Sequence, residues 1–179
     1  MADPPSPTGV GTGPEVVVSD EQSVHHIDAT RWADLARAVL RDHGVVGELT
    51  LSFVERDEMA ALNSTHMCVD APTDVLAFPL DVDPDEVAAG VPVLVGDVVI
   101  CPSVAADAAA THAGTFDDEL ALLTVHGVLH VLGHDHAEPA ERAAMRSAER
   151  RALEAHHWHG ASPSGFRHDH RVDNGGPDS

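Results

Sequence analysis

Residues 126–136 read His-Gly-Val-Leu-His-Val-Leu-Gly-His-Asp-His, and this stretch decides both the fold and the candidate chemistry. It closes a long apolar run that begins near Glu119. The run is too long for one strand and rich in leucine, which predicts a buried helix. On a helix, His126 and His130 lie one turn apart and project from the same face. Gly133 follows three residues later, where helices commonly end and the chain can turn back.

Such a turn would bring His136 towards the two helical histidines. Three imidazoles that converge on one point leave a fourth position open, which is how proteins hold a catalytic zinc. We therefore predict His126, His130 and His136 as metal ligands. The alternative is that they are ordinary core or surface histidines in a chain with 14 histidines. The glycine, the third histidine and the apolar helix favour the metal site.

The spacing of these histidines is that of the metzincin proteases, with one difference. Metzincins place a glutamate directly after the first histidine, where it serves as the general base of peptide hydrolysis. Here Gly127 occupies that position. Glycine inside a helix costs about 1 kcal/mol relative to alanine, so we expect a neighbouring group to need the space above Gly127. The missing glutamate argues against a metalloprotease.

The composition indicates an acidic protein of one domain. The 179 residues include 30 acidic and 10 basic side chains, which gives a net charge of −20, and every basic residue is an arginine. Such a charge repels nucleic acid unless arginines gather locally or a cation intervenes. Cys68 and Cys101 imply no disulfide framework. No signal-like leader follows Met1, and no apolar run reaches the ~18 residues of a membrane span, so we expect a cytoplasmic protein.

The chain divides into a disordered N-terminal tail (1–14), one domain (15–158) and a disordered, histidine-containing C-terminal tail (159–179). Thr30 and Thr115 are the predicted N-caps of the first helix and of the histidine helix. Strands interleaved with helices, followed by helices only, predict an α+β fold with a small mixed sheet covered by helices. The predicted strands are 15–19, 48–54, 73–79 and 93–101; the predicted helices are 31–41, 55–63, 102–110, the histidine helix after Thr115, and 138–158. We expect the histidines near the C-terminus to be solvated and to bind metal only adventitiously. They are His156, His157, His159, His168 and His170.

Three blocks of sequence, in this order, resemble the YbeY family of metal-dependent endoribonucleases, the rRNA maturation factors. The blocks are Leu62-Asn63 with Asp70-Ala-Pro-Thr-Asp-Val-Leu-Ala-Phe-Pro79, then Gly96-Asp-Val-Val-Ile-Cys-Pro102, then residues 126–136. The resemblance runs from about Glu15 to Trp158. It implies an α+β fold with a four-stranded mixed sheet, and one zinc ion per chain held by His126, His130 and His136. It also implies cleavage of single-stranded RNA in late 16S rRNA processing and ribosome quality control.

Two positions depart from the family pattern. Met67 stands where the family usually carries an arginine associated with the RNA-binding cleft, and His134 stands where the residue before the aspartate is usually aromatic. His134 either faces solvent or competes as a ligand. Asp135 either fixes the turn and orients an imidazole, or takes part in catalysis, and we favour the structural role. No catalytic residue is assigned.

The open metal position suggests a mechanism. The metal would lower the pKa of a bound water to about 7 and draw charge from a phosphate oxygen. The sequence does not decide whether hydroxide or a ribose 2′-hydroxyl is the nucleophile. It also does not decide which metal is bound, since three imidazoles accept nickel or cobalt as well as zinc. The alternative function is a non-catalytic ribosome-associated zinc protein. Expected partners are single-stranded RNA, an rRNA precursor and the ribosome, with weak, salt-sensitive RNA binding by the chain alone.

Overall fold

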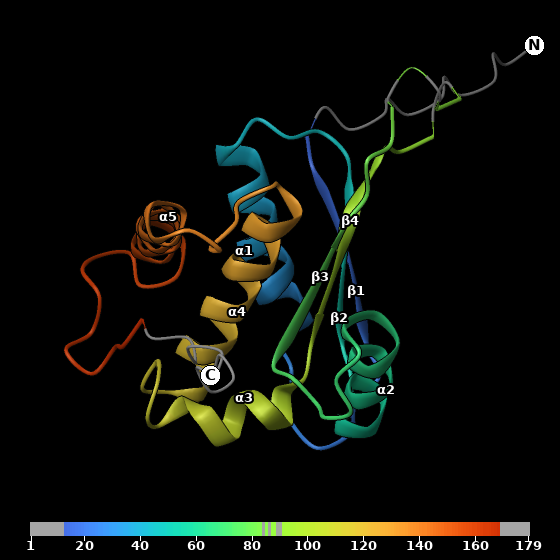
Figure 1. The fold of residues 1–179 in the computed structure, drawn as a ribbon. Helices are drawn as coiled ribbons and strands as arrows, with labels where there is room; N and C mark the ends of the chain where they lie inside the picture. The colour runs from blue at the N-terminus through green and yellow to red at the C-terminus, as the bar shows by residue number, and fades with distance from the viewer. Residues whose placement is uncertain (1–12, 84, 86, 89–90, 169–179) are drawn as a thin grey trace, which may run out of the picture.

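A four-stranded sheet forms the centre of the structure, a computed structural model that describes residues 13–83, 85, 87–88 and 91–168 (Figure 1). The strand order is β1-β2-β4-β3. Strands β1, β2 and β4 are parallel, and β3 pairs antiparallel with β4 at one edge. The predicted small mixed sheet of an α+β fold is confirmed. The strands are β1 (Glu15–Asp20), β2 (Glu48–Phe53), β3 (Val75–Pro79) and β4 (Leu94–Ile100).

Helices cover both faces of this sheet (Figure 1). Helices α1 and α4 pack on one face, α5 lies outside them, and α2 lies on the opposite face. The helices are α1 (Ala29–Asp42), α2 (Arg56–Met67), α3 (Pro102–Ala109), α4 (Phe116–Val131) and α5 (Pro139–His156). Helix α2 extends four residues beyond its predicted end, to a left-handed residue at Cys68.

The helix caps follow one prediction and overturn another. Thr115 caps α4 as expected, because its hydroxyl accepts a hydrogen bond from the N–H of Asp118 (3.1 Å). The prediction that Thr30 caps α1 is wrong. Asp28 is the N-cap, and its carboxylate accepts from the N–H of Arg31 (3.1 Å). Aspartate caps at least as well as threonine, so the helix starts at the earlier of two suitable residues.

The main core lies between the sheet and helices α1 and α4. Leu49, Leu51 and Phe53 alternate along β2 and are all buried against these helices. A smaller cluster on the opposite face joins Met59 of α2 to Val99 of β4. Because helix α4 also contacts α3 and α5, most of its residues are buried, as its apolar sequence predicted. Within the described residues, no helix is both long and apolar enough to cross a membrane.

Helix α4 approaches the sheet unusually closely at two glycines. A Cβ placed on Gly127 would lie 2.5 Å from Cγ1 of Val98 on β4. A Cβ on Gly96 of β4 would lie 2.7 Å from Cγ1 of Val131 on α4. The expectation that a neighbour needs the space above Gly127 is confirmed, and the neighbour is a core valine.

Asp118 joins the start of α4 to the end of α5. Its side chain is almost fully buried. One carboxylate oxygen accepts hydrogen bonds from the Trp158 indole (2.7 Å) and from His157 Nε2 (2.8 Å), and the other accepts from the Thr115 hydroxyl (2.7 Å). Burial alone would raise the pKa of Asp118, but these hydrogen bonds outweigh it and lower the pKa below its usual value. The carboxylate is therefore held ionised in the core.

The chain after α5 folds back onto the domain as far as it is described. The Phe166 ring packs edge-on against the Trp158 ring, with centroids 4.7 Å apart, and the Arg167 N–H donates to the His112 carbonyl (3.0 Å). The expectation that the C-terminal histidines are solvated is wrong for His157 and His168, whose side chains are 5% and 12% exposed. The division at residues 14 and 158 stays a prediction; residues 1–12 and 169–179, with His170, lie outside the described part.

We expect Gly127→Ala to destabilise the fold, because the added methyl group overpacks the core at a cost of about 1–3 kcal/mol. Alanine also favours the helix by ~1 kcal/mol relative to glycine, so the net loss in the free energy of unfolding is smaller by that amount. The measurement is the free energy of urea unfolding. Val98→Ala removes the clashing methyl groups, so the double variant Gly127→Ala/Val98→Ala should be more stable than the sum of the two single changes predicts. Strict additivity of the two changes would contradict the proposed contact.

We expect Asp118→Ala to lower the free energy of unfolding by about 1–3 kcal/mol, because it leaves buried donors without their acceptor. The matched control is the neighbouring Asp117→Ala. Asp117 is exposed and pairs with Arg31 at the surface, so its loss should cost less than about 1 kcal/mol. An equal loss of unfolding free energy in the two variants would contradict the proposed contribution of the buried hydrogen bonds to stability.

Candidate metal centre

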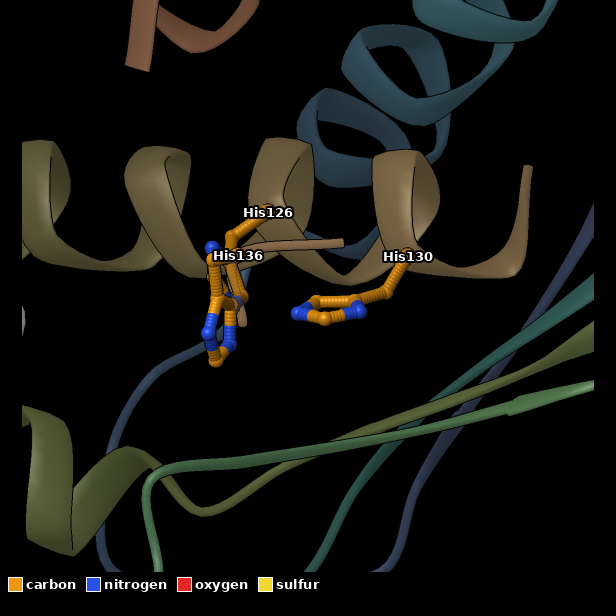
Figure 2. Close-up of side chains that lie close together, drawn as sticks. All are labelled: His126, His130 and His136. Carbon is orange, nitrogen blue, oxygen red and sulfur yellow. The ribbon is translucent and has the colours of Figure 1, made fainter. Parts of the chain in front are cut away.

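The three predicted ligands come together at the C-terminal end of α4 (Figure 2). His126 and His130 project from the same face of the helix, and His136 reaches them from the loop that follows. One ring nitrogen from each histidine lies within 4.8 Å of the other two. Among the residues that the structure describes, this is the one group of three or more potential ligands gathered so closely.

The loop that delivers His136 is fixed by backbone hydrogen bonds and by Asp135. Gly133 adopts φ +92°, which lets the N–H of His134 bond back to the carbonyl of Leu129 (3.0 Å). The Asp135 carboxylate then accepts from the N–H groups of His136 (2.6 Å) and Ala137 (3.3 Å). The His136 N–H holds the pKa of Asp135 below its usual value. Asp135 therefore has the turn-fixing role that the sequence favoured.

The rings are arranged around a common point. The His130 ring stands nearly perpendicular to the His136 ring, at 87° with centroids 4.9 Å apart, and its centroid is 4.6 Å from that of His126. Burial, and then the neighbouring imidazoles of His126 and His136, lower the pKa of His130 to about 4. His130 is consequently neutral at pH 7, and the neutral imidazole is the form that binds a metal.

A buried glutamate, which the sequence reasoning missed, holds the first histidine. Glu149 on α5 is 1% exposed, and its Oε1 lies 2.6 Å from Nδ1 of His126. A carboxylate oxygen accepts a hydrogen bond when Nδ1 carries the ring proton, so this contact favours the Nδ1–H tautomer of His126. The other nitrogen, Nε2, is then left with the lone pair that a metal requires.

One signal could have pointed to Glu149. It lies on the inward face of α5, four residues after buried Met145 and four before buried Leu153. A carboxylate in the apolar stripe of an amphipathic helix needs a buried partner, and the metal-site histidines are the obvious partners to test. A separation of 23 positions hid the His126–Glu149 pair, because no local spacing connects the two residues.

His134 does not join the three converging histidines. Its ring packs edge-on against His43 at the end of α1, with centroids 5.6 Å apart. Burial, the nearby His43 and Arg151 together lower the pKa of His134. Met67, which the resemblance marked as a departure from the expected arginine, is 51% exposed at the end of α2.

The donor set fits a zinc ion. Zinc binds imidazole nitrogen at about 2.0–2.1 Å and prefers tetrahedral sites, so three histidines leave one position for water or substrate. The contact with Glu149 orients the His126 ring, as carboxylates do in many zinc sites. The rings would have to draw slightly closer around an ion, because their ligand atoms lie up to 4.8 Å apart. Nickel and cobalt suit the same three imidazoles.

Comparison with known proteins identifies a family over most of the chain. The family described as "Endoribonuclease YbeY" matches residues 17–157. A relative of that name from Salinispora tropica is 49% identical over 136 residues, which cover 71% of this chain and 87% of the relative. Another, from Beutenbergia cavernae, is 44% identical and covers 76% of this chain and 93% of the relative.

A solved structure supports the architecture. The solution structure of a protein from Thermotoga maritima is similar with a TM-score of 0.54 and 24% sequence identity. The match covers 78% of this chain and 87% of that protein. At this level of identity, the likeness concerns the fold alone.

We expect the metal-free protein to lose stability as the pH falls from about 6.5 to about 4, because the folded state holds the pKa of His130 near 4. In that window the unfolded chain takes up a proton at this residue and the folded chain does not, which favours unfolding. His130→Gln should flatten the pH dependence of the urea unfolding free energy over this window. An unaltered profile in His130→Gln would contradict the depressed pKa.

Proposed function

The chain belongs to the YbeY endoribonuclease family, and on this premise we propose that it is a zinc-dependent endoribonuclease. Its substrate is single-stranded RNA, and its role is late 16S rRNA processing and ribosome quality control. One zinc ion per chain is held by His126, His130 and His136. The observation that carries this proposal is the approach of three ring nitrogens to within 4.8 Å of one another in a chain of this family.

The residues of this chain prepare the site for phosphodiester cleavage. A zinc ion held by the three histidines would supply Lewis acidity towards a phosphate oxygen and lower the pKa of a bound water. Glu149 favours the Nδ1–H tautomer of His126, and the neutral ring of His130 needs no deprotonation at pH 7. Asp135 holds the loop that positions His136.

The packing beside the first ligand speaks against peptide hydrolysis. A protease of similar histidine spacing needs a glutamate immediately after the first histidine. A side chain at Gly127 would start 2.5 Å from Cγ1 of Val98, so a glutamate there would have to displace a core valine. The chain therefore lacks that base, and the core packs closely against the position where it would stand.

The distribution of arginines bears on how an acidic chain binds RNA. Four of the ten arginines lie on helix α5, and all four are exposed: Arg142, Arg146, Arg150 and Arg151. This helix also carries Glu149, which contacts the metal-site histidine. The helix also carries Glu141 and Glu154, so the four arginines give it a small positive excess that could face phosphate groups. The net charge of −20 still opposes strong binding of free RNA, so we propose that a ribosomal partner supplies part of the affinity.

The test combines zinc content with RNA cleavage for the whole chain and for His126→Ala. We expect the wild type to bind one zinc ion and to cut single-stranded but not duplex RNA. His126→Ala removes one ligand and should lower both zinc occupancy and cleavage by about 100-fold or more. An rRNA precursor presented on ribosomal particles should be cut at lower protein concentration than the free RNA.

The matched control is His156→Ala, because His156 bonds Asp42 and lies outside the converging histidines. It should retain zinc binding and cleavage. Zinc bound without cleavage of any RNA would support the non-catalytic ribosome-associated alternative. Cleavage by metal-free protein would refute the role of zinc.

A further inference from the structure

The segment after α5 lies beside the candidate metal centre although the family match ends at residue 157. We call residues 160–168 the C-terminal strap. The strap leaves α5 through His159, which adopts a left-handed φ of +53°, and the Gly160 N–H bonds to the Glu154 carbonyl (2.9 Å). From there it runs back towards the loop between α3 and α4.

Two contacts anchor the strap to the domain. The Phe166 ring packs on Trp158, whose indole donates to buried Asp118. The Arg167 N–H donates to the His112 carbonyl (3.0 Å), which ties the strap to the α3–α4 loop. An apolar contact and a backbone hydrogen bond on consecutive residues fix the path of the chain just before His168.

His168 then shares one carboxylate with a metal-site histidine. Its Nε2 lies 2.7 Å from Oε2 of Glu149, whereas Oε1 of the same carboxylate lies 2.6 Å from Nδ1 of His126. The side chain of His168 is 12% exposed and that of Glu149 is 2% exposed. Each carboxylate oxygen thus has its own imidazole, and the shared group is shielded from water.

We propose that His168 is a positioning residue of the metal centre, which acts through Glu149 to fix the orientation and tautomer of His126. The inference rests on the proposed metal centre. A carboxylate held at both oxygens cannot rotate about its terminal bond, so Oε1 stays directed at Nδ1 of His126. Without the His168 donor, Oε2 loses a buried hydrogen bond, and the hold on the orientation of the carboxylate is weakened. Groups that orient a ligating histidine typically change metal affinity 10–100-fold when they are removed.

The test uses the full chain with His168→Ala, His168→Gln and the control His156→Ala. The dissociation constant for zinc is measured by competition with a chelator. His168→Ala should weaken zinc binding about 10–100-fold. Glutamine can donate to Oε2 from its side-chain amide, so His168→Gln should recover most of the affinity. His156→Ala, which breaks a bond to Asp42, should bind zinc as the wild type does.

A second readout needs no metal. Nitrogen-detected NMR of the histidine side chains in the metal-free chain should show His126 protonated on Nδ1 in the wild type and in His168→Gln. His168→Ala should show a mixture of the two tautomers of His126. Unchanged zinc affinity together with a single tautomer in His168→Ala would overturn the inference. Failure of the wild type to bind zinc would instead overturn the metal centre, and the NMR result would still decide the role of His168.

Discussion

The close packing of helix α4 on the sheet is the constraint on which the rest of the structure depends. Gly127 and Gly96 remove the side chains that would hold the two layers apart, and Val98 and Val131 fill the space. Since α1, α3 and α5 surround the same helix, α4 has little freedom to shift or rotate. Its last two turns carry two of the three converging histidines, so the packing of the core also fixes the positions of these two side chains in the candidate metal centre.

Buried carboxylates and imidazoles form the second level of organisation. Glu119 is fully buried and accepts from His112 (2.8 Å), Asp118 accepts from His157, and Glu149 accepts from two histidines. A chain without lysine has few cations to offer such groups, and its described arginine pairs lie at the surface. Histidine takes their place in the interior, where a partly apolar ring with a polar edge can be buried at lower cost than a guanidinium. The high histidine content therefore serves the core as well as the candidate metal centre.

Much of this architecture could be predicted because its signals are local. The apolar run identified α4, the spacing of its histidines and Gly133 identified the converging triad, and alternating residues identified the strands. The prediction failed where two local signals competed, as at Asp28 and Thr30, and where a contact joins distant parts of the chain. Glu149 and His168 belong to the second group. Their roles depend on how α5 and the strap pack in three dimensions, and a histidine in a polar, glycine-rich segment carries no mark of burial.

The location of the site along the chain has a consequence for the order in which the protein is made. The sheet is complete by residue 100, whereas the histidines, Glu149 and His168 all lie between residues 126 and 168. Synthesis proceeds from the N-terminus, so all four strands leave the ribosome before α4 does. One apolar face of the sheet has only α1 to cover it until residues 116–131 follow. The helix that shields this face and the residues that surround His126 therefore come from the same later stretch of the chain.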